Sequence, residues 1–114
     1  MENSKETENK ISQLQMLEQN VQNILIQKQT FQSQMIEIDN ALEELEKTKG
    51  NSYKIVGAVM ISASKDDLKK DLDSKKEIVN LRINSIEKQE NQLKDRASKL
   101  QSEVLEEIKE KDGN

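Results

Sequence analysis

The stretch YKIVGAVMISASKDDL, residues 53–68, is an apolar run in a chain otherwise rich in Lys, Glu, Gln and Asn. Its segments 53–56 and 59–62 consist largely of β-branched and apolar residues, as strands do. The two residues between these segments begin with Gly57, and a two-residue loop with Gly first suits a type II′ turn. The stretch therefore predicts a single β-hairpin over about residues 53–62.

The composition of the whole chain does not suit a compact globular core. Charged residues make up 35% of the 114 residues and hydrophobic residues only 32%, with one Phe, one Tyr and no Trp. A chain of this kind is either disordered or a long helical coiled coil. The spacing of the apolar residues decides between these two classes.

The residue types that are missing exclude several kinds of chemistry. Without Cys or His, the chain cannot use a thiolate nucleophile, a zinc site of the usual kind or imidazole acid–base catalysis. The net charge of −4 argues against nucleic-acid binding, which needs a clustered basic surface. The apolar run at residues 55–64 is too short to span a bilayer, and the polar residues 1–10 show no signal-peptide pattern. We therefore expect a cytoplasmic protein that is not an enzyme, has no cofactor and binds no membrane.

The segment before the hairpin carries a heptad seam, in which successive residues step alternately by 3 and 4. Its positions are Leu14, Leu17, Val21, Ile24, Lys28, Phe31, Met35, Ile38, Leu42 and Leu45. This seam predicts one helix over about residues 8–49, some 60 Å long at about 1.5 Å per residue. Gly50 is expected to end the helix in the left-handed backbone conformation.

A second seam follows the hairpin. Its positions are Leu72, Lys76, Val79, Ile83, Ile86, Glu90, Leu93, Ala97, Leu100 and Val104. Beyond Val104 the strict heptad position is Glu107, and Ile108 is its apolar neighbour. Ser64 is placed to cap the start of this helix, which is predicted over about residues 65–110.

The two seams agree with each other if the helices run antiparallel. From Leu14 with Leu100 to Leu42 with Leu72, nine successive pairs have residue numbers that add to 114. The fold axis then falls at Gly57, inside the predicted hairpin. We therefore predict a mostly α fold, with two long helices in an antiparallel coiled coil joined by a single β-hairpin. Periodicity alone also allows each helix to form a parallel homodimer.

Three seam positions are charged, and two of them, Lys28 and Glu90, lie in adjacent layers of opposite helices. They either pair with each other and fix the register or extend beside the seam into solvent.

The hairpin carries more apolar side chains than two thin helices can cover, and its strand edges expose unpaired backbone groups. It either folds against the helix ends or joins hairpins of other subunits in a shared sheet or barrel. We predict oligomerisation into a β-barrel base. The residues predicted to form that contact are Tyr53, Ile55, Val56, Gly57, Val59, Met60 and Ile61.

This order of helix, hairpin and helix resembles prefoldin, and in particular its archaeal-like β-type subunit. The resemblance rests on YKIVG at residues 53–57, KDDL at residues 65–68 and the helix segment at residues 81–93. It implies a single prefoldin-like domain over residues 1–114 and a hexamer in which two α-type subunits join four copies like this chain. It also implies a chaperone that holds unfolded polypeptides without ATP and passes them to a group II chaperonin.

The chain ends would form the tips of the coiled coil, where client proteins are expected to bind. The candidate client-binding residues are Ile11, Leu14, Met16, Leu17, Leu100, Val104, Leu105 and Ile108. Leu14, Leu17 and Leu100 could instead simply close the seam. The charged residues 103–112 could contact a chaperonin or form a solvated helix end. A structural coiled-coil adaptor or spacer that binds one folded partner is the competing functional prediction.

Overall fold

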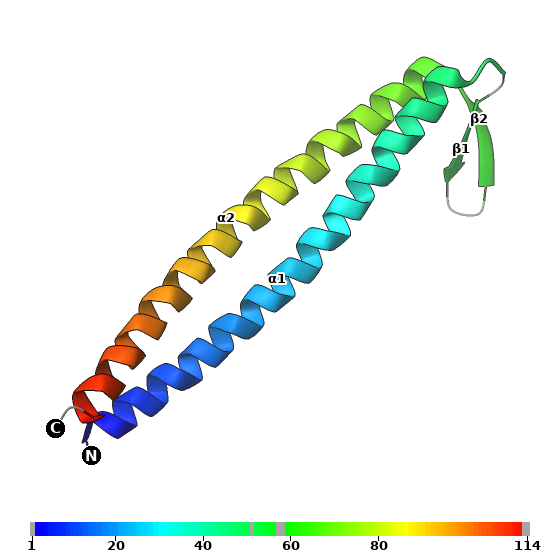
Figure 1. The fold of residues 1–114 in the computed structure, drawn as a ribbon. Helices are drawn as coiled ribbons and strands as arrows, with labels where there is room; N and C mark the ends of the chain where they lie inside the picture. The colour runs from blue at the N-terminus through cyan, green and yellow to red at the C-terminus, as the bar shows by residue number, and fades with distance from the viewer. Residues whose placement is uncertain (1, 51, 57–58, 113–114) are drawn as a thin grey trace. The chain divides into compact units, whose positions relative to one another are not determined.

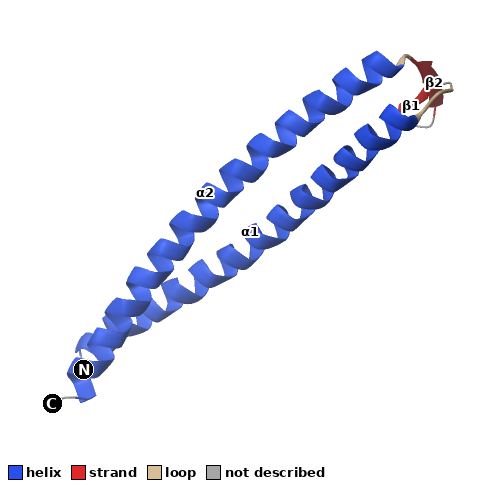
Figure 2. Ribbon diagram, turned by 45° about the horizontal axis from the view of Figure 1, so that its top comes forward, coloured by secondary structure: helices blue, strands red, loops and turns tan. Residues whose placement is uncertain are grey.

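The computed structural model describes residues 2–50, 52–56 and 59–112. It contains four elements in the order α1 (Glu2–Lys47), β1 (Ser52–Val56), β2 (Val59–Ala63) and α2 (Lys65–Asp112) (Figure 1). The described chain is therefore helical apart from one antiparallel two-stranded hairpin and short connections, as the colouring in Figure 2 shows. Over these residues, neither helix is apolar enough to cross a membrane.

The contacts divide the chain into two compact units. The terminal unit comprises Met1–Lys28 and Ser85–Asn114, and the central unit comprises Gln29–Asn84 with the hairpin. Within the terminal unit, Thr7 contacts Glu107 and Lys28 contacts Glu90, so the two helix segments run antiparallel. Within the central unit, Asp39 pairs with Lys76 and Glu46 contacts Lys65, which gives the same direction. The antiparallel prediction is confirmed in each unit, and the parallel homodimer is not needed to explain either seam.

The observed register is close to the predicted one. Thr7 and Glu107 have numbers that add to the predicted 114, whereas Asp39 with Lys76 gives 115. The hairpin pairs Ser52 with Ala63, which also gives 115. The strand pairs agree with the predicted segments 53–56 and 59–62, and their sum is one higher than the sum predicted for the helices. Gly57 and the predicted type II′ turn lie outside the described residues.

The first helix has different ends from those predicted. It begins at Glu2 rather than near residue 8, and it ends at Lys47. Gly50 does not adopt the left-handed conformation, so the predicted glycine stop is wrong. The last carbonyls are satisfied by side chains instead: Thr48 Oγ1 donates to the Glu44 carbonyl at 2.8 Å, and Lys65 Nζ donates to the Glu46 carbonyl at 3.1 Å.

The second helix begins as its sequence predicts. The Ser64 hydroxyl accepts a hydrogen bond from the Asp67 amide at 3.1 Å, and the Ser64 carbonyl accepts one from the Leu68 amide at 3.0 Å. Ser64 is thus the N-cap. Asp66 and Asp67 place negative charge at the positive end of the helix dipole.

The core lies along the seam that the heptads predict. Its most buried apolar residues are Leu17, Val79, Ile86 and Val104, and most other seam residues are half-buried. Lys76 is an exception, because it is exposed and forms a 2.8 Å ion pair with Asp39. That contact raises the pKa of Lys76 through its hydrogen bond with Asp39.

Candidate functional site

The hairpin exposes apolar side chains on both of its faces. Ile55 pairs with Met60 in the strand register, and the next pair is Val56 with Val59. Successive pairs point to opposite faces, and all four of these residues are exposed. The exposed residues of the predicted contact surface are Tyr53, Ile55, Val56, Val59, Met60 and Ile61. Gly57, the remaining member of that set, lies outside the described residues.

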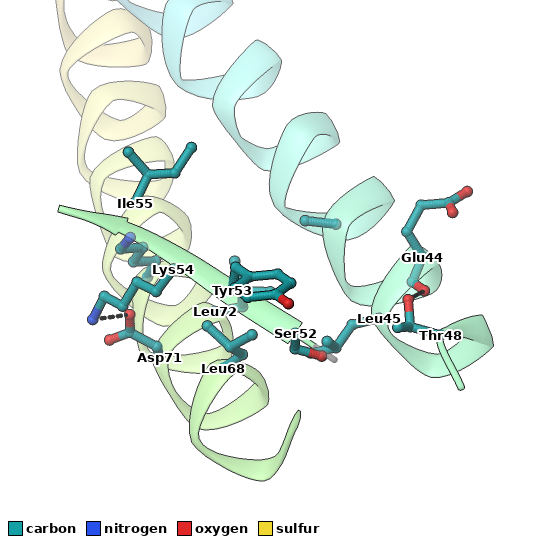
Figure 3. Close-up of a pocket in the computed structure, with 12 residues that line it drawn as sticks. Glu44, Leu45, Thr48, Ser52, Tyr53, Lys54, Ile55, Leu68, Asp71 and Leu72 are labelled. Atoms are coloured by element: carbon teal, nitrogen blue, oxygen red, sulfur yellow. Dashed lines mark hydrogen bonds and ion pairs between the residues drawn. The ribbon is translucent and has the colours of Figure 1, made fainter. Parts of the chain in front are cut away.

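One side of the hairpin is tied to the base of the helices within the central unit. Lys54 Nζ forms a 2.9 Å ion pair with Asp71, drawn as a dashed line in Figure 3. The hydrogen bond from Lys54 lowers the pKa of the Asp71 carboxyl. Tyr53, Leu68 and Leu72 lie together beside β1 (Figure 3), where they line an open groove of about 540 Å³. Folding against the helix end therefore occurs, but it does not cover the apolar faces of the hairpin.

The candidate client-binding residues all belong to the terminal unit, but they differ in exposure. Ile11, Met16, Leu105 and Ile108 are exposed, whereas Leu14 and Leu100 are half-buried. Leu17 and Val104 are buried in the seam, with 8% and 7% of their surface exposed. With the two helices in contact as described here, an unfolded client can reach the four exposed side chains but not the buried Leu17 and Val104.

Four polar residues of the terminal unit, Thr7, Lys10, Glu103 and Glu107, form a cluster that we call the terminal clasp. Thr7 Oγ1 donates a hydrogen bond to Glu107 Oε2 at 2.6 Å. Lys10 Nζ pairs with Glu107 Oε1 and also with Glu103 Oε2, the latter at 3.6 Å. The hydrogen bond with Glu107 raises the pKa of Lys10. The hydrogen bonds from Lys10 and then Thr7 lower the pKa of the Glu107 carboxyl.

The sequence contained a signal for this clasp that the apolar pattern did not show. Lys10 and Thr7 continue the first seam beyond Leu14 by steps of 4 and 3, and Glu107 continues the second beyond Val104. Thr7, Lys10 and Glu107 are half-buried, as seam residues are. Ile108, the apolar neighbour, is exposed instead.

The charged seam residues Lys28 and Glu90 form a pair in the terminal unit. Lys28 Nζ lies 3.2 Å from Glu90 Oε1 and 3.9 Å from a Glu87 oxygen. Lys94 Nζ approaches the second oxygen of Glu90 at 3.7 Å. Glu90 is only 5% exposed, so of the two alternatives the structure shows pairing and not extension of both side chains into solvent.

Comparison with known proteins identifies the family. A family model described as "Prefoldin subunit" matches residues 8–111. The chain belongs to the prefoldin family. Membership of this family implies a chaperone function, and the resemblance inferred from the hairpin and second helix is confirmed.

The curated relatives of this prefoldin chain include archaeal proteins named "Prefoldin subunit beta". The protein of Methanospirillum hungatei JF-1 is 38% identical over 107 residues, which cover 92% of this chain and 89% of the relative. That of Caldivirga maquilingensis is 36% identical over 98 residues, which cover 84% and 81%. These matches confirm the resemblance to the archaeal β-type subunit.

A solved structure supports the fold. The crystal structure of the prefoldin β subunit from Thermococcus strain KS-1 matches with a TM-score of 0.83 and 29% sequence identity. The match covers 87% of this chain and 89% of that one. The predicted arrangement of two long helices joined by one hairpin is thus confirmed.

Proposed function

We propose that this chain is a subunit of an ATP-independent holdase, which binds unfolded polypeptides with its coiled-coil tips and prevents their aggregation. The observation that carries the proposal is the exposure of Ile11, Met16, Leu105 and Ile108 in the terminal unit of a prefoldin-family chain. The whole chain would act as one prefoldin-like domain, since the family match extends across both units. Its action would be binding rather than catalysis.

Assembly would use the hairpin. A single two-stranded hairpin is marginal in water, and its unpaired edges are open to further strands. Pairing with hairpins of an α-type prefoldin subunit and of further copies of this chain would cover Ile55, Val56, Val59 and Met60, which one chain leaves exposed. The relatives are themselves named as subunits. We propose the hexamer of two α-type and four β-type subunits as the working assembly.

Client binding would be weak at each tip and strong in combination. Unfolded chains expose scattered apolar side chains, and Met16, being flexible and polarizable, can adapt to many of them. Several tips on one assembly raise the effective affinity because the second contact becomes intramolecular. Clients held in this way would pass to a group II chaperonin, with the charged residues 103–112 as a candidate contact.

The first test reconstitutes the chain with an α-type subunit, measures the native mass, and assays aggregation of several unrelated denatured proteins. In the tip variant, Ile11, Met16, Leu105 and Ile108 are each replaced by Ser. We expect the tip variant to assemble normally and to lose most of its protection. The matched control carries Ile36→Ser and Leu81→Ser, two changes at residues that are 60% and 63% exposed in the central unit. Equal protection by the tip variant and this control would contradict tip binding.

The same assay separates a holdase from the competing adaptor function. A holdase protects unrelated denatured proteins, because it recognises apolar side chains rather than one surface. An adaptor that binds one folded partner would protect none of them, even when its assembly is complete.

A further inference from the structure

We propose that the terminal clasp is an electrostatic gate on client capture, which holds the two chain ends together and keeps Leu17 and Val104 covered. Opening the clasp would uncover these residues and strengthen binding of unfolded chains. The inference rests on the proposed holdase function, because it concerns the regulation of the same tips.

The clasp occupies the last layers of the seam, where the apolar pattern stops. Thr7 and Lys10 of α1 and Glu107 of α2 are at seam positions. The ends of a coiled coil open most readily, since few contacts hold them. Here the contacts nearest the chain ends are polar, so the closed state of the tip depends on charge as well as on apolar burial.

The carboxylate of Glu107 makes most of the polar contacts that hold the tip closed. Glu107 accepts from Thr7 with one oxygen and pairs with Lys10 through the other, while Glu103 gives Lys10 a second partner. The side chains of Lys10 and Glu107 are 28% and 21% exposed, so the pair is sheltered more than an ordinary surface pair. The ion pair is still partly exposed to solvent, so dissolved salt can screen it. The Debye length falls from about 10 Å at 0.1 M salt to about 3 Å at 1 M salt, so high salt should weaken the pair.

The buried apolar residues nearest the terminal clasp are those that a client would contact once the tip opened. Val104 lies one turn from Glu107 on α2, and Leu17 lies two turns from Lys10 on α1. Both are buried, whereas Ile11 and Ile108, which are adjacent in sequence to Lys10 and Glu107, are exposed. A client that binds the open tip better than the closed one shifts the population toward the open state. The strength of the clasp therefore sets how much of the tip's apolar surface is available.

The test uses the assembly reconstituted with an α-type subunit and two readouts. Hydrogen exchange of the amides in residues 8–18 and 98–108 reports opening of the tip without any client. Binding of reduced and carboxymethylated lactalbumin, a permanently unfolded protein, reports capture. The variant Glu107→Gln weakens the clasp, and Asp39→Asn is the matched control, because it removes a cross-helix ion pair of the central unit.

A covalent link between the two helices at the clasp should have the opposite effect to Glu107→Gln, because it keeps the tip closed. The chain has no Cys, so the double variant Thr7→Cys with Glu107→Cys has one reactive pair, which a short bifunctional thiol reagent can join. We expect Glu107→Gln to speed exchange and to tighten lactalbumin binding about two- to fivefold at low salt, the range that a single ion pair supports. We expect the joined double variant to bind more weakly than its unjoined form. The Asp39→Asn control should match the wild type.

Each contrary result has a separate meaning. Unchanged exchange in Glu107→Gln would show that the clasp does not hold the tip closed, and the gate would be rejected. Faster exchange with unchanged or weaker lactalbumin binding would also overturn the gate, while leaving the holdase proposal intact. If neither the wild type nor any variant bound unfolded protein, the holdase proposal would fail and the gate with it.

Discussion

Lys28 and Glu90 place opposite charges in a seam whose neighbouring layers are apolar. Glu90 is almost fully buried, and it receives Lys28 on one oxygen and Lys94 on the other. A buried pair of this kind adds little net stability, but it penalises any register that separates the charges. A polar residue at a single seam position is a known way for coiled coils to select one register. We infer that this layer helps to choose the antiparallel register of the terminal unit.

Removing one partner of this pair should be costly. Lys28→Met keeps the length of the side chain but leaves Glu90 with Lys94 alone, so we expect a loss of about 1–3 kcal/mol in the free energy of unfolding. Urea unfolding followed by circular dichroism measures it. The control combines Lys28→Met with Glu90→Leu, which removes both charges and should recover most of the stability. A double variant as unstable as the single one would show that the pair does more than neutralise a buried charge.

The clasp should open at both extremes of pH. Folding lowers the pKa of Glu107 from 4.5, so its stabilisation is present above that value and is lost as the pH falls through the lowered pKa. Folding raises the pKa of Lys10 from 10.5, so its stabilisation is present below that value and is lost as the pH rises through the raised pKa. The charged groups that face each other are Lys10 from α1 and Glu103 and Glu107 from α2.

Pyrene excimer fluorescence can follow this opening. Labels on Lys5→Cys and Lys109→Cys, two exposed positions of the terminal unit, should give strong excimer emission between pH 4.5 and pH 10.5 and weaker emission well outside that range. Helicity is recorded in parallel to separate opening of the tip from unfolding. Glu107→Gln should remove the acid transition. An unchanged acid transition in that variant would assign the effect to other carboxyl groups.

At the scale of residues, sequence reasoning succeeded where apolar spacing carried the information. It placed Leu17, Val79, Ile86 and Val104 in the seam because heptad spacing is visible in one chain. It did not identify the clasp residue Lys10, because a polar residue at a seam position looks like any solvated charge until its partner is known. The glycine stop at Gly50 failed for a related reason: Thr48 and Lys65 supply the caps, and the contact from Lys65 crosses 19 positions of sequence.

At the scale of elements, the boundary between β2 and α2 depends on Ser64. Its hydroxyl accepts from the Asp67 amide, one of the four amides that a helix start leaves unpaired. The cap fixes where the helix begins after the hairpin, and so which residues of α2 face α1. The type and order of the elements were predictable, because the heptad spacing, the apolar strand segments and the Ser64 cap are all visible in the sequence.

Loss of this cap should destabilise the central unit. Ser64→Ala removes the acceptor, and we expect a decrease of about 1 kcal/mol in the free energy of unfolding, within the usual range of about 0.5–2 kcal/mol. Thermal unfolding of the isolated chain measures it. Ser64→Asp keeps an oxygen at the cap position and should retain wild-type stability. If Ser64→Asp were as unstable as Ser64→Ala, the hydroxyl would have a role other than capping.

At the scale of the whole molecule, the exposed large apolar residues are unevenly distributed among the described residues. The hairpin contributes six of them, and the terminal unit contributes Ile11, Met16, Leu105 and Ile108 among others. A soluble chain rarely exposes so much apolar surface on ten residues of strand without a partner. The sequence predicted that the hairpin was too apolar for one chain to cover. What covers these side chains stays a prediction, namely the hairpins of other subunits, because one chain cannot show the residues of a partner.

Assembly through the hairpin should therefore be separable from folding of the helices. Ile55 and Met60 are paired on one face, and Ile55→Ser with Met60→Ser makes that face polar while leaving the backbone pairing possible. We expect native mass spectrometry with an α-type subunit to show loss of the hexamer, and circular dichroism to show unchanged helicity, since neither side chain belongs to the seam. The double change Ile36→Ser and Leu81→Ser, on exposed helix positions, should assemble normally. If the hairpin variant still formed the hexamer, that face would not be the assembly surface, and the other face, with Val56 and Val59, would have to carry the contact.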